Sequence, residues 1–270
     1  MSALSVLDAL ILGVVEGITE YLPVSSTGHL LVVQRLLGLG EGADKIAADT
    51  YAVVIQIGAI LAVVALYRRR IASMAKGVVG RDADGRHVLL MLAASFLPAA
   101  IIGVSLGDTI KDELFSPGPV VIAWIAGGIF LLLWKPRAGG LSLESMPVRS
   151  ALIIGLAQSV ALWPGVSRSL VTIVAALLVG CTMAAALEYS FLLGLATLSA
   201  ATVLDLAKDG DVLLDTYGLL RPAIGVIAAF VTAVLAVRWL VSYLANRPLS
   251  VFGWYRLVAA AVTLLVWSSL

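Results

Sequence analysis

The sequence contains few of the residues on which cysteine, histidine and ionic chemistry depend. Its 270 residues include one cysteine, two histidines and only 13% charged residues, whereas about 25% of an ordinary soluble domain is charged. Because one cysteine cannot close an intrachain disulfide, a disulfide scaffold and cysteine-pair redox chemistry are excluded. Two histidines leave too few ligands for a zinc finger or a haem pair.

The chain also lacks an excess of either charge. Its 18 Lys and Arg residues against 17 Asp and Glu residues give a net charge of +1, so no overall field would attract nucleic acid, and no nucleic-acid partner is expected. Apolar residues dominate instead: 61% of the chain is hydrophobic, and apolar stretches recur from end to end. This composition predicts a single all-α, polytopic membrane domain over residues 1–270.

Six apolar stretches approach the roughly 20 residues that a helix needs to cross a bilayer. They are residues 51–67, 88–105, 119–134, 188–204, 222–240 and 254–270. Polar connections are expected between them at 68–87, 108–113, 135–137 and 205–215. Lys and Arg concentrate in the first and third of these connections, which predicts that both are cytoplasmic and that the two acidic connections lie outside.

Two further apolar regions are interrupted by a polar, helix-breaking turn. In the first region, arms at 4–22 and 30–39 flank the turn 23–28, and in the second, arms at 151–163 and 170–181 flank the turn 164–169. Asp8 and the absence of a basic segment before it argue against a cleaved signal peptide. Short arms joined by a polar turn predict re-entrant hairpins, which are tolerated at membrane depth only inside protein or beside a wet cavity.

The two interrupted regions resemble each other at a constant offset of 142 residues. Ser25 matches Ser167 and Glu16 matches Gln158 at this offset, and three predicted spans follow each hairpin. Because the charge bias gives the halves opposite orientations, the sequence predicts an inverted repeat of residues 1–140 and 141–270. The two turns are therefore expected to approach each other near the pseudo-two-fold axis.

The first arm carries two carboxylates at membrane depth. Glu16 and Glu20 lie four residues apart and therefore on one face of a helix. Ionisable residues within a membrane are functional by default, which predicts a catalytic or metal-binding pair. A polar pair that extends to the interface is the alternative.

The first turn continues with a row of hydroxyl residues and a histidine. Ser25, Ser26 and Thr27 precede Gly28 and His29, and hydroxyls and free N–H groups at the start of a helix are typical of an anion site. Gly28 would let the backbone approach a ligand closely. The imidazole of His29 is a candidate nucleophile or general acid/base, with a structural histidine as the alternative.

The second turn repeats this pattern with a permanent positive charge. Arg168 stands between Ser167 and Ser169 directly after a helix break, and Thr172 follows. Since a guanidinium can bind two phosphate oxygens in a fork, this turn predicts a phosphate site. A lipid-headgroup anchor is the alternative for Arg168.

Two glutamines also lie at membrane depth in the predicted layout. Gln56 is a candidate substrate ligand inside the span 51–67, and Gln158 lies in the arm before the second turn. Either amide could instead hydrogen-bond between helices.

Together these motifs resemble the bacterial undecaprenyl-diphosphate phosphatase family, also called bacitracin-resistance proteins. The resemblance covers essentially the whole chain. It rests on Glu16-x-x-x-Glu20 before PVSSTGH at 23–29, on IQIGAILAVV at 55–64, on PGVSRSLVT at 164–172 and on EYSFLL at 188–193. We see no departure from the family pattern at the residues carried over.

The resemblance implies an integral-membrane enzyme that hydrolyses undecaprenyl diphosphate to undecaprenyl phosphate and phosphate. Such an enzyme recycles the lipid carrier of cell-wall synthesis and confers bacitracin resistance. Its site would open to the outer side of the bacterial inner membrane and use a divalent cation, Mg²⁺ or Ca²⁺. The catalytic residues carried over are Glu16, Glu20, Ser26, His29 and Arg168, with Glu16 and Glu20 as metal ligands. The expected substrate ligands are Ser25, Thr27, Gly28, Gln56, Ser167, Ser169 and Thr172.

Several alternatives stay open at this point. An inverted repeat with broken helices is also typical of a secondary transporter or a lipid flippase. A mechanism with two catalytic histidines, found in another lipid-phosphatase superfamily, is excluded because no histidine follows Ser167-Arg168. The nucleophile is His29, Ser26 or water, and the sequence does not decide between a monomer and a homodimer.

Overall fold

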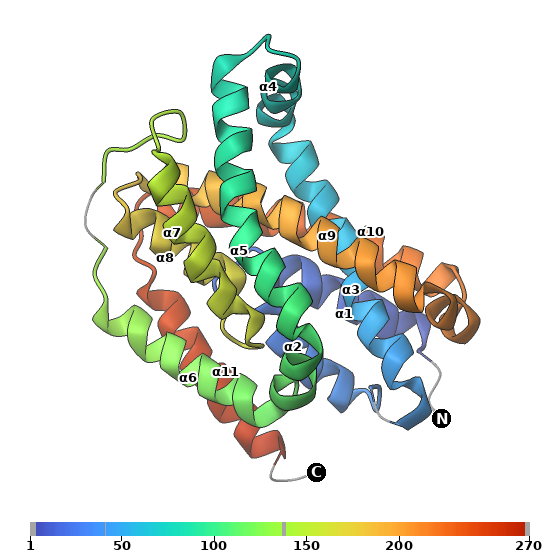
Figure 1. Ribbon diagram of the computed structural model, residues 1–270. Coiled ribbons are helices and arrows are strands. Elements are labelled where there is room, and N and C mark those ends of the chain that lie inside the picture. Colours follow the sequence, from blue (N-terminus) through green and yellow to red (C-terminus); the bar gives the residue numbers. More distant parts are fainter. Residues whose placement is uncertain (1–3, 41, 137–138, 268–270) are drawn as a thin grey trace.

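The computed structural model describes residues 4–40, 42–136 and 139–267, and these residues form an all-helical structure (Figure 1). Within them the chain forms no β-strand, only an isolated bridge between Leu141 and Cys181. The α-helices are α1 (Val6–Thr19), α2 (Ser26–Leu36), α3 (Lys45–Leu66), α4 (Arg68–Val78), α5 (Ala83–Leu114), α6 (Pro117–Leu133), α7 (Val148–Gln158), α8 (Arg168–Leu178), α9 (Met183–Tyr217), α10 (Leu220–Leu244) and α11 (Ser250–Trp267). Two short 3₁₀-helices, η1 (Gly42–Asp44) and η2 (Ser159–Leu162), complete the described elements.

Each of the six predicted spans lies within or largely overlaps one helix. Four of these helices, α3, α5, α9 and α10, are long and apolar enough to cross a membrane. The helices α6 and α11, which correspond to the spans 119–134 and 254–270, are shorter, and residues 268–270 lie outside the described part. The chain is therefore a multi-pass, helical membrane protein with four long candidate spans.

The predicted connections 108–113 and 205–215 are wrong as loops, because both segments continue a helix. Residues 205–215 lie inside α9, whose 35 residues extend over roughly 52 Å, well beyond a hydrocarbon core of about 30 Å. Charged residues outside the bilayer do not end a helix, whereas a glycine that adopts positive φ does. Gly218, at φ 65°, ends α9 and donates its N–H to the Leu214 carbonyl.

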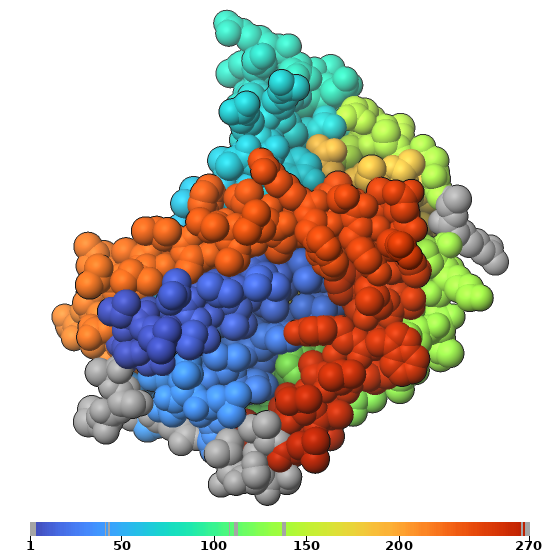
Figure 2. Space-filling view, turned by 180° about the vertical axis from the view of Figure 1, so that it is seen from behind, coloured from blue at the N-terminus to red at the C-terminus, as the bar shows by residue number. Residues whose placement is uncertain are grey.

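The connection 68–87 is also partly helical. Its first residues form α4, which packs against the beginning of α5, and this pair projects away from the rest of the molecule (Figures 1 and 2). Of the connection 135–137, Arg137 lies outside the described residues. The projecting pair carries the triple Arg68, Arg69 and Arg70, the most basic run of the chain.

Both predicted hairpins form helix pairs that pack on each other. In the first, α1 and α2 are joined by residues 20–25, and in the second, α7 with η2 and α8 are joined by residues 163–167. The hairpins are surrounded in a related way, since α1 packs against α10 and α7 packs against α5. Figure 2 shows α1, in blue, beside α10, in orange. The pairs α3 with α9 and α6 with α11 also pack together.

Candidate active site

The two turns contain the only non-glycine residues at positive φ in the described part of the chain. Ser25 has φ 73° and ψ 101°, and Ser167 has φ 74° and ψ 109°. Each serine caps the following helix: the Ser25 hydroxyl oxygen accepts the Gly28 N–H, and the Ser167 hydroxyl oxygen accepts the Leu170 N–H. A hydroxyl N-cap therefore starts both α2 and α8. Positive φ is strained for a serine, and such strain concentrates at functional sites.

The two turns contact each other, as the repeat predicted. The Ser169 hydroxyl, at the start of α8, donates to the Leu22 carbonyl of the first turn at 2.8 Å. The indole of Trp124 on α6 donates to the Val24 carbonyl at 2.9 Å. The turns are thereby fixed to each other and to α6.

Arg256 on α11 links both turns, and the sequence analysis missed it. Its guanidinium is fully buried and donates only to backbone carbonyls. Those of Pro23, Gly165 and Val166 belong to the turns, and those of Ala123 and Trp124 belong to α6. The available signal was a lone arginine inside the predicted span 254–270, because a charge at membrane depth is costly without partners.

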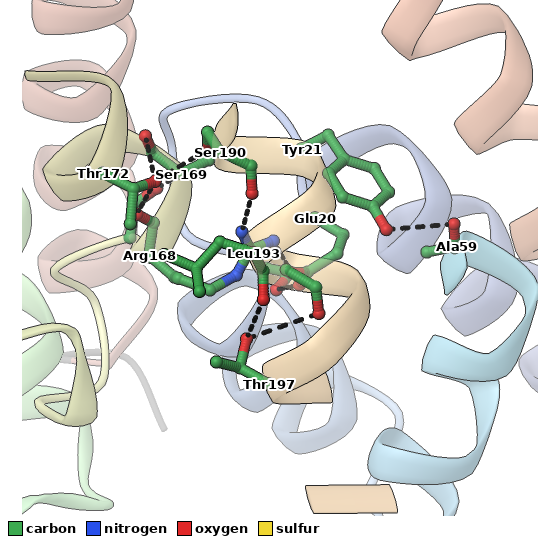
Figure 3. Close-up of polar contacts among 12 residues, drawn as sticks. Glu20, Tyr21, Ala59, Arg168, Ser169, Thr172, Ser190, Leu193 and Thr197 are labelled. Carbon is green, nitrogen blue, oxygen red and sulfur yellow. Dashed lines mark hydrogen bonds and ion pairs between the residues drawn. The ribbon is translucent and has the colours of Figure 1, made fainter. Parts of the chain in front are cut away.

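A chain of polar contacts crosses from one turn to the other. Arg168 Nη2 donates to Glu20 Oε1 at 2.8 Å, and the Ser26 hydroxyl donates to Glu20 Oε2. Arg168 Nη1 donates to the Ser190 carbonyl of α9 at 2.9 Å, and Figure 3 shows the guanidinium between Glu20 and α9. Gly194 permits this approach, since a Cβ there would lie 2.6 Å from Arg168 Cζ.

Glu20, Ser26 and Arg168 line a pocket of about 200 Å³ between the turns and the long helices. Seven of the predicted site residues lie on its wall. They are Glu20, Ser25, Ser26, Thr27, Gln56, Ser167 and Arg168. Gln158 and Thr197 line the same pocket, although the sequence analysis did not include either among the site residues. The geometry therefore brings most of the predicted site together.

Three predicted substrate ligands lie behind this wall. The Ser169 and Thr172 hydroxyls are fully buried and donate to the carbonyls of Leu22 and Arg168. A Cβ on Gly28 would lie 2.7 Å from the buried ring of Trp124, so this glycine permits helix packing. In this structure the three residues hold the turns in place, and none of them lines the pocket.

His29 also lies outside the pocket lining, on the side of α2 that faces α6 and α11. Its Nδ1 lies 2.7 Å from the Ser25 carbonyl and its Nε2 lies 2.8 Å from the Tyr255 hydroxyl. Because a carbonyl can only accept, Nδ1 carries a proton. The ring also contacts Trp124 and stacks on Tyr255. Both ring nitrogens are therefore used in holding the first turn.

Glu16 is fully buried one helical turn before Glu20, and neither of its carboxylate oxygens has a hydrogen-bond partner. Buried carboxylates are normally paired or bound to a metal. Among the described residues no group of three or more His, Cys, Asp or Glu side chains could hold a metal ion. The free carboxylate of Glu16 beside Glu20 fits a cation such as Mg²⁺, which is held by one or two carboxylates with phosphate oxygens and water.

This arrangement suits phosphoryl transfer. A hydroxyl bonded to a carboxylate is an activated-nucleophile pair. The guanidinium of Arg168 and the hydroxyl residues Ser25, Thr27 and Ser167 line the same pocket, and such groups suit the stabilisation of a transferring phosphate. The pocket thus combines Glu20 from the first half of the chain with Arg168 from the second, and Glu16 lies buried one helical turn from Glu20, outside the pocket lining.

Comparison with known proteins gives one family and many close relatives. The family described as bacitracin resistance protein BacA matches residues 9–262. A protein of Sorangium cellulosum named undecaprenyl-diphosphatase is 46% identical over 265 residues, which cover 95% of this chain and 85% of that protein. Similar proteins include undecaprenyl-diphosphatase 1 of Chromobacterium violaceum, 43% identical over 97% of this chain and 96% of its own. The undecaprenyl-diphosphatase of Nitrosospira multiformis is 44% identical over 96% of this chain and 94% of its own.

Proposed function

The chain belongs to the bacitracin resistance protein BacA family, and we propose that it acts as an undecaprenyl-diphosphatase through the pocket between its two turns. The reaction is hydrolysis of undecaprenyl diphosphate to undecaprenyl phosphate and inorganic phosphate. It returns the lipid carrier to cell-wall synthesis and thereby gives resistance to bacitracin. The observation that carries the chemistry is the Ser26, Glu20 and Arg168 chain, in which a hydroxyl, a carboxylate and a guanidinium line one pocket.

Ser26 is the nucleophile in this proposal. As its Oγ bonds to the terminal phosphorus, the bridging P–O bond breaks and undecaprenyl phosphate leaves, while the hydroxyl proton passes to Glu20 Oε2. Water then hydrolyses the phosphoserine and releases inorganic phosphate. Arg168 stabilises the oxygens of the transferring phosphate in both steps. His29 is a positioning residue, because it holds the carbonyl of Ser25 next to the nucleophile.

Glu16 and Glu20 would hold the divalent cation. The free, buried carboxylate of Glu16 would be the main protein ligand, since both oxygens of Glu20 already accept hydrogen bonds. A bound Mg²⁺ or Ca²⁺ supplies charge neutralisation at the phosphate oxygens. The chain's own residues supply the nucleophile, its base and the guanidinium.

The membrane arrangement proposed is six spans and two re-entrant hairpins in an inverted repeat. It is supported by the equal backbone angles of Ser25 and Ser167 and by the corresponding packing of α1 on α10 and α7 on α5. The basic segment at 68–87 lies on the cytoplasmic side of the bacterial inner membrane. The pocket then opens to the outer side.

A secondary transporter or lipid flippase is the second candidate, because irregular turns at membrane depth line a polar cavity in such proteins too. The test is release of phosphate from undecaprenyl diphosphate by the purified protein in detergent, where no transport is possible. We expect turnover by the wild type and at least about a hundredfold lower kcat for Ser26→Ala. A folded wild-type protein that binds the lipid but releases no phosphate would contradict the enzyme and favour transport.

A further inference from the structure

Two amide side chains in the pocket lack the partners that buried amides normally have. Gln158, at the end of α7, is only 3% exposed, and neither its Oε1 nor its Nε2 has a hydrogen-bond partner. Gln56 on α3 lines the same pocket, and its Oε1 is also buried without a partner. Most buried side-chain polar atoms are hydrogen-bonded, so an amide without a protein partner at either atom is available to bind a ligand in the pocket.

The sequence analysis gives a hydrogen bond to a neighbouring helix as the alternative role of Gln158. That bond does not form, although α7 packs closely on α5 and α8. Gln34 on α2 shows what a structural glutamine does in this protein: its Nε2 donates to the Ala48 carbonyl at 2.8 Å. Gln158 therefore differs from Gln34 in facing the pocket rather than a carbonyl of a neighbouring helix.

The turns and the surrounding helices supply different kinds of side chain to the pocket wall. The turns supply the guanidinium, the acid and the hydroxyls, whereas α3, α7 and α9 supply Gln56, Gln158 and Thr197. The long helices α5 and α9 also supply apolar residues to this wall, namely Ala99, Leu198 and Ala201. A ligand bound by both parts would thus have a strongly charged end at the turns and a less charged end beside apolar side chains.

We propose that Gln158, whose Nε2 is a free donor, forms the subsite for the lipid-linked phosphate of a polyprenyl diphosphate, and that Gln56 lines this subsite. This inference rests on the proposed function, since it assigns the second half of the same substrate. The terminal phosphate carries up to two negative charges and matches Arg168, whereas the lipid-linked phosphate carries one. Neutral amide N–H donors bind one charge without a counter-ion, and the adjoining apolar residues suit the first carbons of the tail.

The decisive variant is Gln158→Leu, because the amide has no partner to lose in the free protein. We expect the Tm of this variant in detergent to be equal to or higher than that of the wild type, since a buried unsatisfied group is removed. We expect KM for undecaprenyl diphosphate to rise roughly tenfold or more, as for the loss of a hydrogen bond to a charged group. The matched control, Gln34→Leu, should lower the Tm and leave KM unchanged.

Inhibition by the two products shows whether the amides bind the lipid-linked phosphate or the terminal phosphate. Undecaprenyl phosphate should inhibit Gln158→Leu more weakly than the wild type by the same factor as the rise in KM, whereas the inhibition constant of inorganic phosphate should not change. An unchanged KM with unchanged inhibition by both products would overturn the subsite. Weaker inhibition by inorganic phosphate alone would also overturn it, because the amides would then serve the terminal phosphate.

The two proposals can fail separately. A wild-type protein without phosphatase activity contradicts the proposed function, whereas an active wild type with an unaffected Gln158→Leu variant contradicts the subsite alone. Binding of undecaprenyl phosphate, measured as a shift in Tm, needs no turnover. An equal shift for the wild type and for Gln158→Leu therefore contradicts the subsite even in an inactive protein.

Discussion

Arg168 makes directed contacts that a simple positive charge does not make. One terminal nitrogen binds Glu20 and the other binds the Ser190 carbonyl, while Nε is buried without a partner. A lysine keeps the charge and loses the planar fork. We therefore expect Arg168→Lys to lower kcat by at least about tenfold and to be nearly as damaging as Arg168→Ala.

The measurement for Arg168 is phosphate release under saturating substrate, with Tm as a check on folding. Arg70 offers a matched control, since it pairs with Glu144 and Glu188 outside the pocket. Arg70→Lys should keep the wild-type kcat. Near-normal turnover in Arg168→Lys would contradict a catalytic role and favour Arg168 as a lipid-headgroup anchor.

Ser26 and His29 can be distinguished because only one of them lines the pocket. Ser26→Ala removes the proposed nucleophile and should lower kcat by at least about a hundredfold. His29→Gln can keep a hydrogen bond but cannot attack phosphorus or cycle a proton. We expect His29→Gln to lose less kcat than Ser26→Ala, as suits a residue that positions the Ser25 carbonyl. The reverse order, in folded proteins, would make His29 the nucleophile or proton shuttle.

Glu16 gives a test of the cation. Its amide variant, Glu16→Gln, keeps the shape of the side chain and removes the one carboxylate in the site without a partner. Activation by Mg²⁺ or Ca²⁺ should then need a higher concentration, while Tm in chelator should equal or exceed that of the wild type, because a buried charge is removed. Titration of divalent cation after chelation measures this, and an unchanged activation curve would exclude Glu16 as a ligand.

The sequence predicted the residue types of the site better than their roles. Glu20, Ser26 and Arg168 could be selected because charged and polar side chains at membrane depth are costly and therefore mark functional sites. Ser169 and Thr172 carry the same hydroxyl but bond to neighbouring carbonyls. The direction of a side chain from a turn depends on backbone angles such as the positive φ of Ser167, and residue identity does not specify these for a serine.

At the scale of elements, the hairpins depend on partners from distant helices. Each turn has a backbone hydrogen bond of its own, from Val24 to Leu22 and from Val166 to Trp163. Arg256 supplies donors to three further carbonyls, those of Pro23, Gly165 and Val166. A buried carbonyl without a donor costs about 1–3 kcal/mol. Arg256→Met should therefore lower the Tm in detergent by more than about 5 °C, with loss of activity as a consequence.

Arg238→Met is the control for this prediction, because Arg238 lies exposed on α10. The control should retain the wild-type Tm. If Arg256→Met unfolded at the wild-type temperature, the turns would be held by their other contacts, such as the bond from Trp124 to Val24.

Helix ends show why the sequence placed the elements better than their limits. Hydropathy predicted an end near residue 204, yet α9 continues to Tyr217, where Gly218 provides the stop. Hydropathy reports where a helix leaves the hydrocarbon, whereas glycine, proline and capping residues report where it ends. The first arms end within a few residues of the predicted 22 and 163, at Thr19 for α1 and at Leu162 for α7 with η2, and Pro23 and Pro164 lie just beyond these ends.

At the scale of the whole molecule, the proposed inverted repeat would account for a site that draws on both halves of the chain. Glu16 and Glu20 come from the first half and Arg168 from the second, and Gln158 stands where the repeat offset places the counterpart of Glu16. Ser25 and Ser167 have nearly the same φ, but the side chains around the two serines differ. The fold therefore brings Glu20 of the first half into contact with Arg168 of the second half, and neither half alone contains both groups.

The opposite orientation of the halves can be tested with single cysteines after replacement of Cys181 by serine. Val79 is a suitable cytoplasmic position, since it is exposed beside Gly80, whose positive φ would strain any side chain placed there. Asp211 is a suitable outer position, exposed on the extension of α9. Val79→Cys should react only with reagent that enters the cell, and Asp211→Cys should react with an impermeant reagent from outside. Labelling of both positions from the same side would contradict the inverted repeat, because the first basic connection and the end of α9 would then share one face of the membrane.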